Sequence, residues 1–348
     1  MSRQTIELRT SPHVRAPASV EQIMRNVIYA LLPIAAFAVW QFGISALALI
    51  LVVTFSALFT EYAFSRSAGR GNTLGDWSAA ISGLLLALTL PPGFPLWMGA
   101  VAGFIAIALG KTLFGGLGYN VFNPALVGRA FVQAAFPVAI TTWTPANLPG
   151  RFTEFIPSTL TPPFMQPPAI AAWSRQQIDA FSGATPLAQW KFEGITTQAT
   201  DLFTGMVAGS TGETSALLIL LCGLYLAARR MLNWRIPLAV LLGAAAVAMV
   251  FFLFDSARYP TPQFVLFSGG LMLAAWFMAS DMVASPVTPI GIWIYGLFIG
   301  ALTVIIRYFG GLSEGVMYAV LLANALSPLI DALTQPRVYG ARKKGADA

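Results

Sequence analysis

The sequence predicts an all-α polytopic membrane protein with about ten transmembrane helices in two inverted repeats. Three observations predict this class. Of the 348 residues, 57% are hydrophobic and only 10% are charged, whereas an average soluble domain carries about a quarter charged residues. Apolar runs of about 20 residues recur, and each can cross a hydrocarbon core of about 30 Å as a helix. The two halves also share a spacing of prolines and glycines.

The predicted spans form two membrane halves of five helices each. The first half, 24–137, holds spans at about 24–41, 44–63, 78–91, 96–113 and 122–137. The second half, 214–333, holds spans at about 214–229, 236–254, 263–280, 288–306 and 314–333. Three further segments complete the chain: an N-terminal segment 1–23, a long connecting segment 138–213 and a tail 334–348.

The basic residues indicate orientation in the membrane rather than nucleic-acid binding. The formal charge of +6 comes from short Lys and Arg clusters between apolar runs, without basic and aromatic interleaving in a soluble region. Most clusters fall on the side that an even number of spans gives to both termini. The positive-inside rule makes that side cytoplasmic, so we expect a multi-pass protein of the bacterial inner membrane with both termini in the cytoplasm.

The long segment 138–213 then lies on the outer side, between the fifth and sixth spans. It is rich in proline, tryptophan and polar residues. Stretches of this length without regular structure are uncommon unless they are functional. We therefore expect this segment to pack against the helices and to carry the functional site.

A shared spacing predicts the inverted repeat. Pro91 lies 24 residues before Gly115-Gly116, and Pro286 lies 24 residues before Gly310-Gly311, with an apolar helix in each interval. In the predicted topology one proline faces outside and the other faces inside, so the two copies cross the bilayer in opposite directions. Prolines that interrupt apolar spans imply short or broken helices, and a ligand site is expected at such breaks.

Seven ionisable residues fall within or near the predicted spans, where a charge is costly unless it is paired, hydrated or functional. They are Glu61, Lys111, Arg129, Asp281, Arg307, Glu314 and Asp331. Most lie close to a span end, where snorkelling or pairing between helices explains them. Arg129 is the exception, because it lies two turns into the span that Asn123-Pro124 opens. The single Cys222 cannot form a disulfide or an all-protein iron–sulfur site within this chain.

Two small-residue motifs could bind an anion. In DAFSGATP, from Asp179 to Pro186, Ser182, Gly183 and Thr185 form a turn where a hydroxyl is exposed and the backbone can approach a phosphate. On these residues alone, an ordinary Ser/Thr-rich turn before a proline is the simpler interpretation. In GSTGET, at 209–214, backbone amides at the start of the sixth span could hold an anion, but helix capping by its hydroxyl residues, Ser210 and Thr214, is the simpler interpretation.

Taken together, several motifs resemble a known family across nearly the whole chain. They are SPHVRAP at 11–17, GDWSAAISGLLLALTLPP at 75–92, FNPALVGRAF at 122–131, DAFSGATP at 179–186, GSTGETSAL at 209–217 and EGVMYAVLLANALSPLIDALTQPRVYG at 314–340. This family contains the D subunit of Rnf electron-transport complexes and the B subunit of the sodium-pumping NADH:quinone reductase. The length and the SPH start resemble the D subunit more closely. Ala180 departs from the usual glycine of the flavin-attachment motif.

The resemblance implies a covalent flavin. In this family the matching threonine is esterified to the phosphate of FMN, which implies FMN on Thr185, with Ser182, Gly183, Asn123 and Arg129 as further cofactor-binding residues. Arg129 could hold a flavin phosphate or favour a reduced, anionic isoalloxazine ring. The resemblance also implies a second, non-covalent flavin such as riboflavin between helices. It implies no metal site.

The resemblance further implies an integral-membrane subunit of an Rnf-type ferredoxin:NAD oxidoreductase that couples electron relay to Na⁺ or H⁺ translocation and is not catalytic alone. Its partners would be the other subunits, especially the extracytoplasmic subunit with covalent FMN, and membrane lipid, without nucleic acid. The residues alone also fit a stand-alone channel or secondary transporter of urea-transporter-like fold. A purely structural scaffold is a third hypothesis, which predicts that Thr185→Ala leaves redox activity intact.

Overall fold

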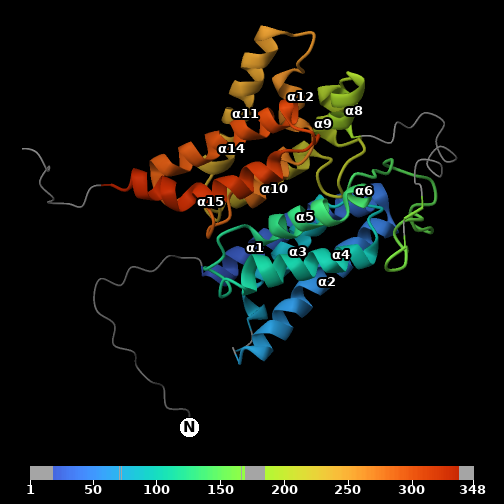
Figure 1. Cartoon of the computed structure of the whole chain (residues 1–348), viewed down its shortest axis with the longest axis vertical. Coiled ribbons are helices and arrows are strands. Elements are labelled where there is room, and N and C mark those ends of the chain that lie inside the picture. Colours follow the sequence, from blue (N-terminus) through green and yellow to red (C-terminus); the bar gives the residue numbers. More distant parts are fainter. Residues whose placement is uncertain (1–18, 70, 72, 166, 169–184, 337–348) are drawn as a thin grey trace, which may run out of the picture.

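The computed structural model describes residues 19–69, 71, 73–165, 167–168 and 185–336, and every regular element among them is helical (Figure 1). The flavin-motif residues Ser182 and Gly183 lie outside the described residues. The start of α1 and the end of α15 lie on the same side of the bundle, opposite α8 and α9 (Figure 1). This arrangement agrees with an even number of membrane crossings.

All ten predicted spans overlap helices. The first half contains α1 (Val20–Phe42), α2 (Ile44–Ser67), the 3₁₀ turn η1 (Leu74–Asp76), α3 (Ser78–Thr89), α4 (Leu96–Ile107) with its π-helical extension η2 (Ala108–Thr112), α5 (Pro124–Ala135) and α6 (Pro137–Ile140). The connecting segment contains α8 (Pro186–Glu193) and α9 (Ala199–Thr204). The second half contains α10 (Ala216–Ala228), α11 (Arg235–Phe254), α12 (Pro262–Phe267), α13 (Leu271–Leu273), the π-helix η3 (Ala274–Met278), α14 (Pro289–Phe309) and α15 (Val316–Thr334).

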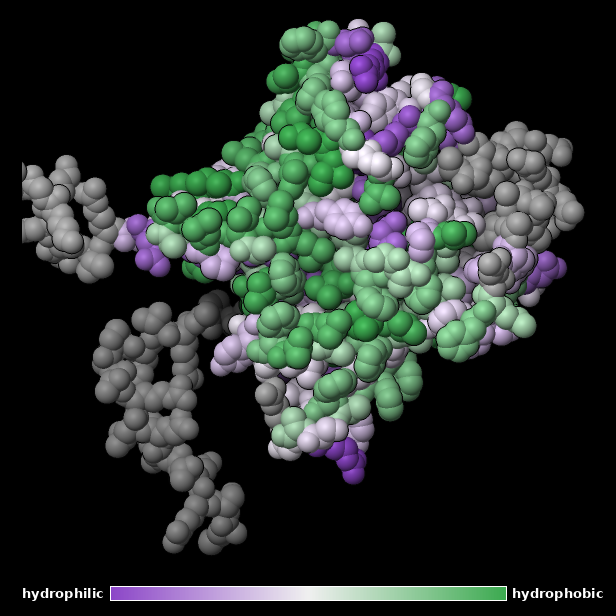
Figure 2. All heavy atoms as spheres, viewed as in Figure 1, coloured by the Kyte–Doolittle hydropathy of each residue, from purple (hydrophilic) through white to green (hydrophobic). Residues whose placement is uncertain are grey.

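Five of these helices, α1, α2, α11, α14 and α15, are long and apolar enough to cross a membrane, and α3, α4 with η2, and α10 are shorter apolar helices. Large apolar side chains face outward on the outer helices, including Phe55 and Phe59 of α2 and Leu253 of α11. Figure 2 shows this hydrophobic surface over both halves, with hydrophilic residues gathered toward the ends of the helices. An exposed apolar surface of this extent is suited to lipid rather than to water.

Four helices begin with a polar cap followed by proline. The pairs are Asn123-Pro124 at α5, Thr185-Pro186 at α8, Thr261-Pro262 at α12 and Thr288-Pro289 at α14. In each pair the cap's side-chain oxygen accepts a hydrogen bond from a backbone amide of the first turn, and proline at that position removes no helical hydrogen bond. This local rule fixes where these four helices begin.

The two halves pack in equivalent ways. Helix α2 packs along α4 in the first half, as α11 packs along α14 in the second, and α4 and α14 each pack against the helix that follows them. At both contacts a glycine meets a backbone carbonyl. Gly103 of α4 lies against Val53 of α2, and Gly300 of α14 lies against Val240 of α11. Small residues let membrane helices approach this closely, and their equivalent positions support the predicted repeat.

The eighth predicted span is broken rather than continuous. It is divided into α12 and the α13–η3 segment by Ser268, Gly269 and Gly270. Gly269 has φ of +61°, a conformation that glycine adopts without steric cost. Broken helices are tolerated in a membrane only where other groups satisfy the freed backbone, so the break marks a place where polar side chains gather.

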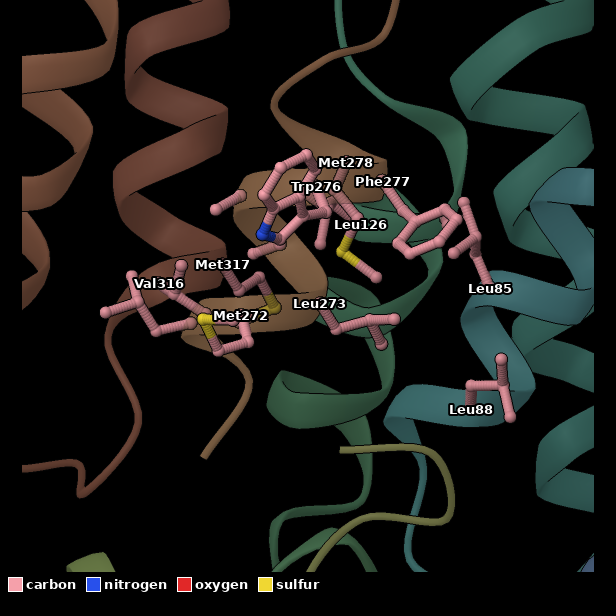
Figure 3. Packing of buried hydrophobic residues seen from close by; sticks show 14 of the residues in the cluster. Leu85, Leu88, Leu126, Met272, Leu273, Trp276, Phe277, Met278, Val316 and Met317 are labelled. Atoms are coloured by element: carbon pink, nitrogen blue, oxygen red, sulfur yellow. The ribbon is translucent and has the colours of Figure 1, made fainter. Parts of the chain in front are cut away.

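The apolar core lies where the halves meet. It brings together α3, α5, η3 and the start of α15, and Figure 3 shows Leu85 of α3 beside Phe277 of η3. Leu126, Leu273 and Met317 fill the same layer. This apolar layer lies between two polar regions, one around Asn123 at the start of α5 and the other around Arg129 further along the helix.

Candidate functional site

Thr185 is buried at the start of a helix. Its residue is 6% exposed, and its Oγ1 accepts a hydrogen bond from the Ala188 backbone amide at 3.3 Å. Thr185 lines a narrow cavity together with Trp143, Ser210, Glu213 and other residues of α9, the α9–α10 loop and the α12 break. The positive end of the α8 dipole therefore points toward the place where a group on Thr185 would lie. Pro186 has no amide hydrogen, and the Ala188 and Gln189 amides already donate to Thr185 Oγ1 and to its carbonyl oxygen.

Lys191 connects α8 to the end of α14 in the second membrane half. Its Nζ donates to the backbone carbonyl oxygens of Arg307 at 2.8 Å, Leu312 at 2.8 Å and Gly310. These carbonyls belong to the C-terminal end of α14 and the turn after it, where a cation is favoured. Partial burial lowers the pKa of the Lys191 ammonium. On the same helix, the Trp190 ring packs against Tyr308 of α14 at 5.3 Å between centroids.

Arg129 of α5 faces a wider cavity beside the first. Its side chain is buried, and its Nη1 has no hydrogen-bond partner among the described residues. Both cavities are lined by Trp143, Glu213 and Glu314. A buried guanidinium without a partner is costly, so the wider cavity is suited to an anionic or carbonyl-bearing ligand.

The α9–α10 loop caps the C-terminal end of α3. The backbone amides of Thr211 and Gly212 donate to the carbonyl oxygens of Leu90 at 2.9 Å and Leu88 at 2.8 Å. These carbonyls lie at the C-terminal end of α3, where helical partners run out.

The predicted capping role of Ser210 and Thr214 is wrong. The cap of α10 is Ser215, whose side chain accepts from the Leu218 backbone amide. Thr214 Oγ1 instead donates to Gln41 Oε1 of α1 at 2.8 Å. Ser210 is 2% exposed, and its Oγ has no hydrogen-bond partner by distance and angle among the described residues.

Two carboxylates lie against the break in the eighth span. A side chain at Gly270 would collide with Glu213, and one at Gly269 would collide with Glu314. Glu213 lies in the loop before α10, outside the membrane-crossing helices. Burial raises its pKa to about 7, although the nearby Arg129 guanidinium acts in the opposite direction. Glu213 can therefore change its charge near neutral pH.

Arg307 stabilises the break between α12 and α13. This arginine is 1% exposed, and its Nη1 and Nη2 donate to the carbonyl oxygens of Val265 at 2.7 Å and Ser268 at 3.1 Å. Its Nη2 also lies 3.7 Å from Glu314 Oε2. The predicted pairing between helices is thus confirmed for Arg307 and Glu314.

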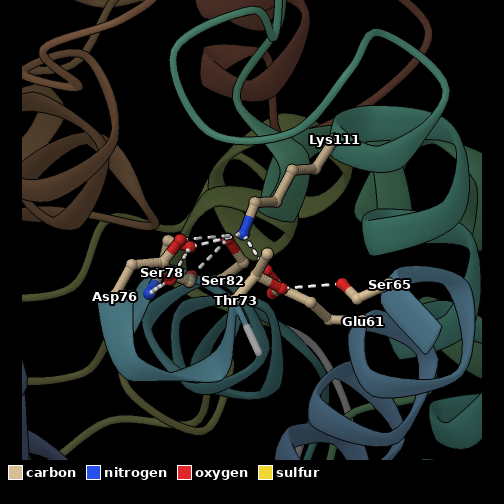
Figure 4. A network of polar contacts seen from close by, with 7 residues as sticks. All are labelled: Glu61, Ser65, Thr73, Asp76, Ser78, Ser82 and Lys111. Carbon is tan, nitrogen blue, oxygen red and sulfur yellow. Dashed lines mark hydrogen bonds and ion pairs between the residues drawn. The ribbon is translucent and has the colours of Figure 1, made fainter. Parts of the chain in front are cut away.

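Lys111 holds the equivalent place in the first half. Its Nζ donates to Glu61 of α2 and to Ser78 Oγ at the start of α3, and it lies 3.6 Å from Asp76 Oδ2 (Figure 4). Pairing is therefore confirmed here too. Like Arg307, Lys111 ends the fourth helix of its half and reaches the segment just before a short helix. The two cations lie toward opposite ends of the bundle, as an inverted repeat requires.

A third cavity lies beside the Lys111 network, between the two halves. Its walls include the amides of Asn120 and Asn123, the rings of Trp276 and Phe277, and Asp281. Asn123 also caps α5 and donates to the Met278 carbonyl oxygen at 3.3 Å.

The structure divides the residues that the sequence singled out. Thr185 and Arg129 face neighbouring cavities, whereas Asn123 caps the N-terminus of α5, about 9 Å from Arg129 along the helix axis at 1.5 Å per residue. Sequence reasoning missed Lys191, Trp143 and Asn120. The available signal for Lys191 was a basic residue six positions after Thr185 in a segment with few charges.

These features define a helical membrane protein built from an inverted repeat, with a buried cation in each half and a broken helix in the second. The sequence matches the model of the NQR2, RnfD, RnfE family over residues 7–340, and the chain belongs to this family.

Curated relatives match along almost their whole length. The D subunit of the ion-translocating oxidoreductase complex of Halorhodospira halophila is 39% identical, over 98% of this chain and 97% of the relative. The D subunit of the proton-translocating ferredoxin:NAD⁺ oxidoreductase complex of Clostridium ljungdahlii is 38% identical, over 99% and 98%. The corresponding D subunit of the Na⁺-translocating complex of Acetobacterium woodii is 40% identical, over 99% and 98%. Similar identity thus joins this chain to relatives named for different ions.

Proposed function

We propose that this chain is the D subunit of an ion-translocating ferredoxin:NAD oxidoreductase complex, and that it carries FMN on Thr185 through a phosphoester and relays electrons coupled to Na⁺ or H⁺ movement. The observation that carries the flavin proposal is geometric. A buried threonine hydroxyl at a helix N-terminus opens onto a cavity next to an arginine that lacks a partner among the described residues.

The residues fit the phosphate end of FMN. Thr185 supplies the ester oxygen, the positive end of the α8 dipole favours the phosphate charge, and the Ser210 hydroxyl lines the same narrow cavity. The wider cavity in front of Arg129 is the place for the ring. FMN supplies electron-transfer chemistry when bound, and the protein supplies position and electrostatics.

Arg129 has a defined role in this proposal. Its charge stabilises the ring when negative charge develops there, and its burial makes that effect stronger than in water. Trp143, which lines both cavities, supplies an apolar surface for the ring and excludes water. Lys191 and Trp190 position Thr185 by holding α8 against α14.

The third cavity supports the second, non-covalent flavin. Asn120 and Asn123 offer amide donors and acceptors, and Trp276 and Phe277 offer aromatic surface, which are the groups that recognise a flat heteroaromatic ring. Asn120→Leu is expected to release the non-covalent flavin from the purified protein and to leave the Thr185 adduct in place.

The proposed orientation in the membrane follows from the Lys and Arg clusters between the spans. We propose that the Lys111 end of the bundle faces the bacterial cytoplasm, that both termini lie there, and that Thr185 faces outside. The partners are then the other subunits of the complex, with an extracytoplasmic covalent-FMN subunit as the electron donor near Thr185.

Mass spectrometry of the intact chain tests the flavin proposal. The chain is produced with a flavin transferase, next to Thr185→Ala and Thr261→Ala. Thr261 is a matched control, because it also caps a helix that begins with proline and accepts a hydrogen bond in the same way. We expect one FMN adduct in the wild type and in Thr261→Ala, and none in Thr185→Ala.

Absence of an adduct from a folded wild-type chain would overturn the flavin proposal. It would favour the stand-alone channel or transporter instead. If Thr185→Ala loses the adduct but leaves ferredoxin:NAD activity of the complex intact, the chain is a scaffold.

A further inference from the structure

Two buried arginines and two partly buried carboxylates lie at the cavities near Thr185. Arg129 of α5, Glu213 of the α9–α10 loop and Glu314 of the turn before α15 line the cavities, and Arg307 of α14 lies behind them, paired with Glu314. Two guanidinium groups and two carboxylates balance to zero when all are ionised. A phosphodiester on Thr185 adds one negative charge, and an electron arriving on the attached group adds another.

Glu213 differs from the other three in its bonding. Arg307 is held by two carbonyl oxygens and by Glu314, and a guanidinium does not give up its proton in a protein. Glu213 has no salt bridge within 4.0 Å among the described residues, while it lines both cavities. It is therefore the group at this site whose charge changes most easily.

We infer that Glu213 takes up the proton that compensates the electron when the group attached to Thr185 is reduced. This inference rests on the proposed function. An uncompensated charge in a buried site is costly because the surroundings cannot solvate it as water does. Protonation of a carboxylate beside the new charge removes that cost, and Glu213 lies in the wall shared by both cavities.

The step balances in atoms and charge. One electron passes from a one-electron donor to the attached group, and one proton passes from water to a Glu213 carboxylate oxygen. The product is a neutral carboxylic acid, and no other bond is broken. Reoxidation returns the electron to an acceptor and the proton to water.

Charged and polar groups on the neighbouring elements change the proton affinity of Glu213. Arg129 lowers its proton affinity from α5, and Arg307 does so from α14, whereas Glu314 raises it from the turn before α15. Ser210, in the same loop, lies beside the carboxylate and favours its ionised form. Burial outweighs these groups and keeps Glu213 near its midpoint at neutral pH.

Redox-difference infrared spectroscopy tests the inference directly. The full chain, purified with its associated subunits and reconstituted in lipid, is reduced electrochemically at pH 7.5. We expect the C=O stretching band of a protonated carboxylic acid to appear on reduction in the wild type and to be absent in Glu213→Gln. Glu193→Gln, an exposed change at the end of α8, is the matched control and keeps the band.

Each outcome supports or overturns either the inference about Glu213 or the proposed function. If the flavin adduct is present and the band is missing from the wild type or persists in Glu213→Gln, the inference is overturned and the proposed function stands. If mass spectrometry finds no adduct on Thr185, both are overturned.

If Glu213→Gln does not fold, Glu213→Asp replaces it. Aspartate keeps a carboxyl group but shortens the side chain, so we expect the band to remain and to shift in frequency. An unshifted band would assign the proton to another residue.

The reduction potential provides an independent readout. Over pH 6.5–8, we expect the potential of the Thr185-attached group to fall more steeply in the wild type than in Glu213→Gln. The difference in slope approaches about 59 mV per pH unit, the value for one proton per electron. Equal slopes would contradict the inference.

Discussion

Replacement of Lys191 by methionine tests how the helix that carries Thr185 is held. The ammonium group donates to three carbonyl oxygens at the end of α14, and methionine keeps the length of the side chain but cannot donate. We expect α8 to separate from α14 more often, while the membrane helices remain folded.

The three hydrogen bonds of Lys191 set the free energy that the substitution is expected to remove. Hydrogen bonds to a charged group contribute about 1.5–3 kcal/mol each, but here one partly exposed ammonium serves three acceptors, and its dehydration offsets part of the gain. A total of about 2–3 kcal/mol remains. At about 1.4 kcal/mol per factor of ten, the open population of α8 rises roughly 30- to 150-fold.

Hydrogen–deuterium exchange measures this opening. The amides of Gln189 and Gly194 are protected by bonds within α8, and their exchange should accelerate by that factor in Lys191→Met. Lys191→Arg retains a cation and serves as the control, with a smaller effect. Unchanged exchange of α8 in Lys191→Met would refute the role given to Lys191, and so would equal acceleration across all membrane helices.

Three further predictions concern other parts of the chain. The folded-state pKa of Glu213 is raised to about 7, so the folded flavin-free chain binds more protons than the unfolded chain. Its stability should therefore fall as pH rises from about 4.5 to 7, by up to about 3 kcal/mol; thermal melts of Glu213→Gln should lack this decline. Gly300→Ala should destabilise by about 1–3 kcal/mol because its Cβ would meet the Val240 carbonyl, whereas Gly311→Ala, in open space, should not. Arg129→Ala should lower the reduction potential of the attached group, because it removes a positive charge beside it. Unchanged flavin content together with unchanged electron transfer would contradict the role proposed for Arg129.

Local chemistry made part of the site predictable. The Thr185-Pro186 pair signals a helix start because both residues act through the backbone of one turn. The sequence analysis predicted only a turn before a proline here, and the start of α8 at this pair gives Thr185 a structural role next to the proposed covalent one. The GSTGET motif misled for the same reason, since hydroxyl residues before an apolar run fit a cap. Thr211 and Thr214 were used instead to bond α3 and α1, which no local pattern encodes.

The sequence by itself determined the membrane class, the helical segments and the repeat, because hydrophobic length, proline position and glycine spacing act within single helices or between copies of one pattern. Only the tertiary structure decided which polar groups meet. Gly269 and Gly270 look like ordinary residues of an apolar span, yet they break it, because Arg307 satisfies the freed carbonyl of Ser268 and two carboxylates occupy the space that side chains would need. The partners of such buried charges lie far apart along the chain, and desolvation stabilises their pairing only once the helices have brought them together.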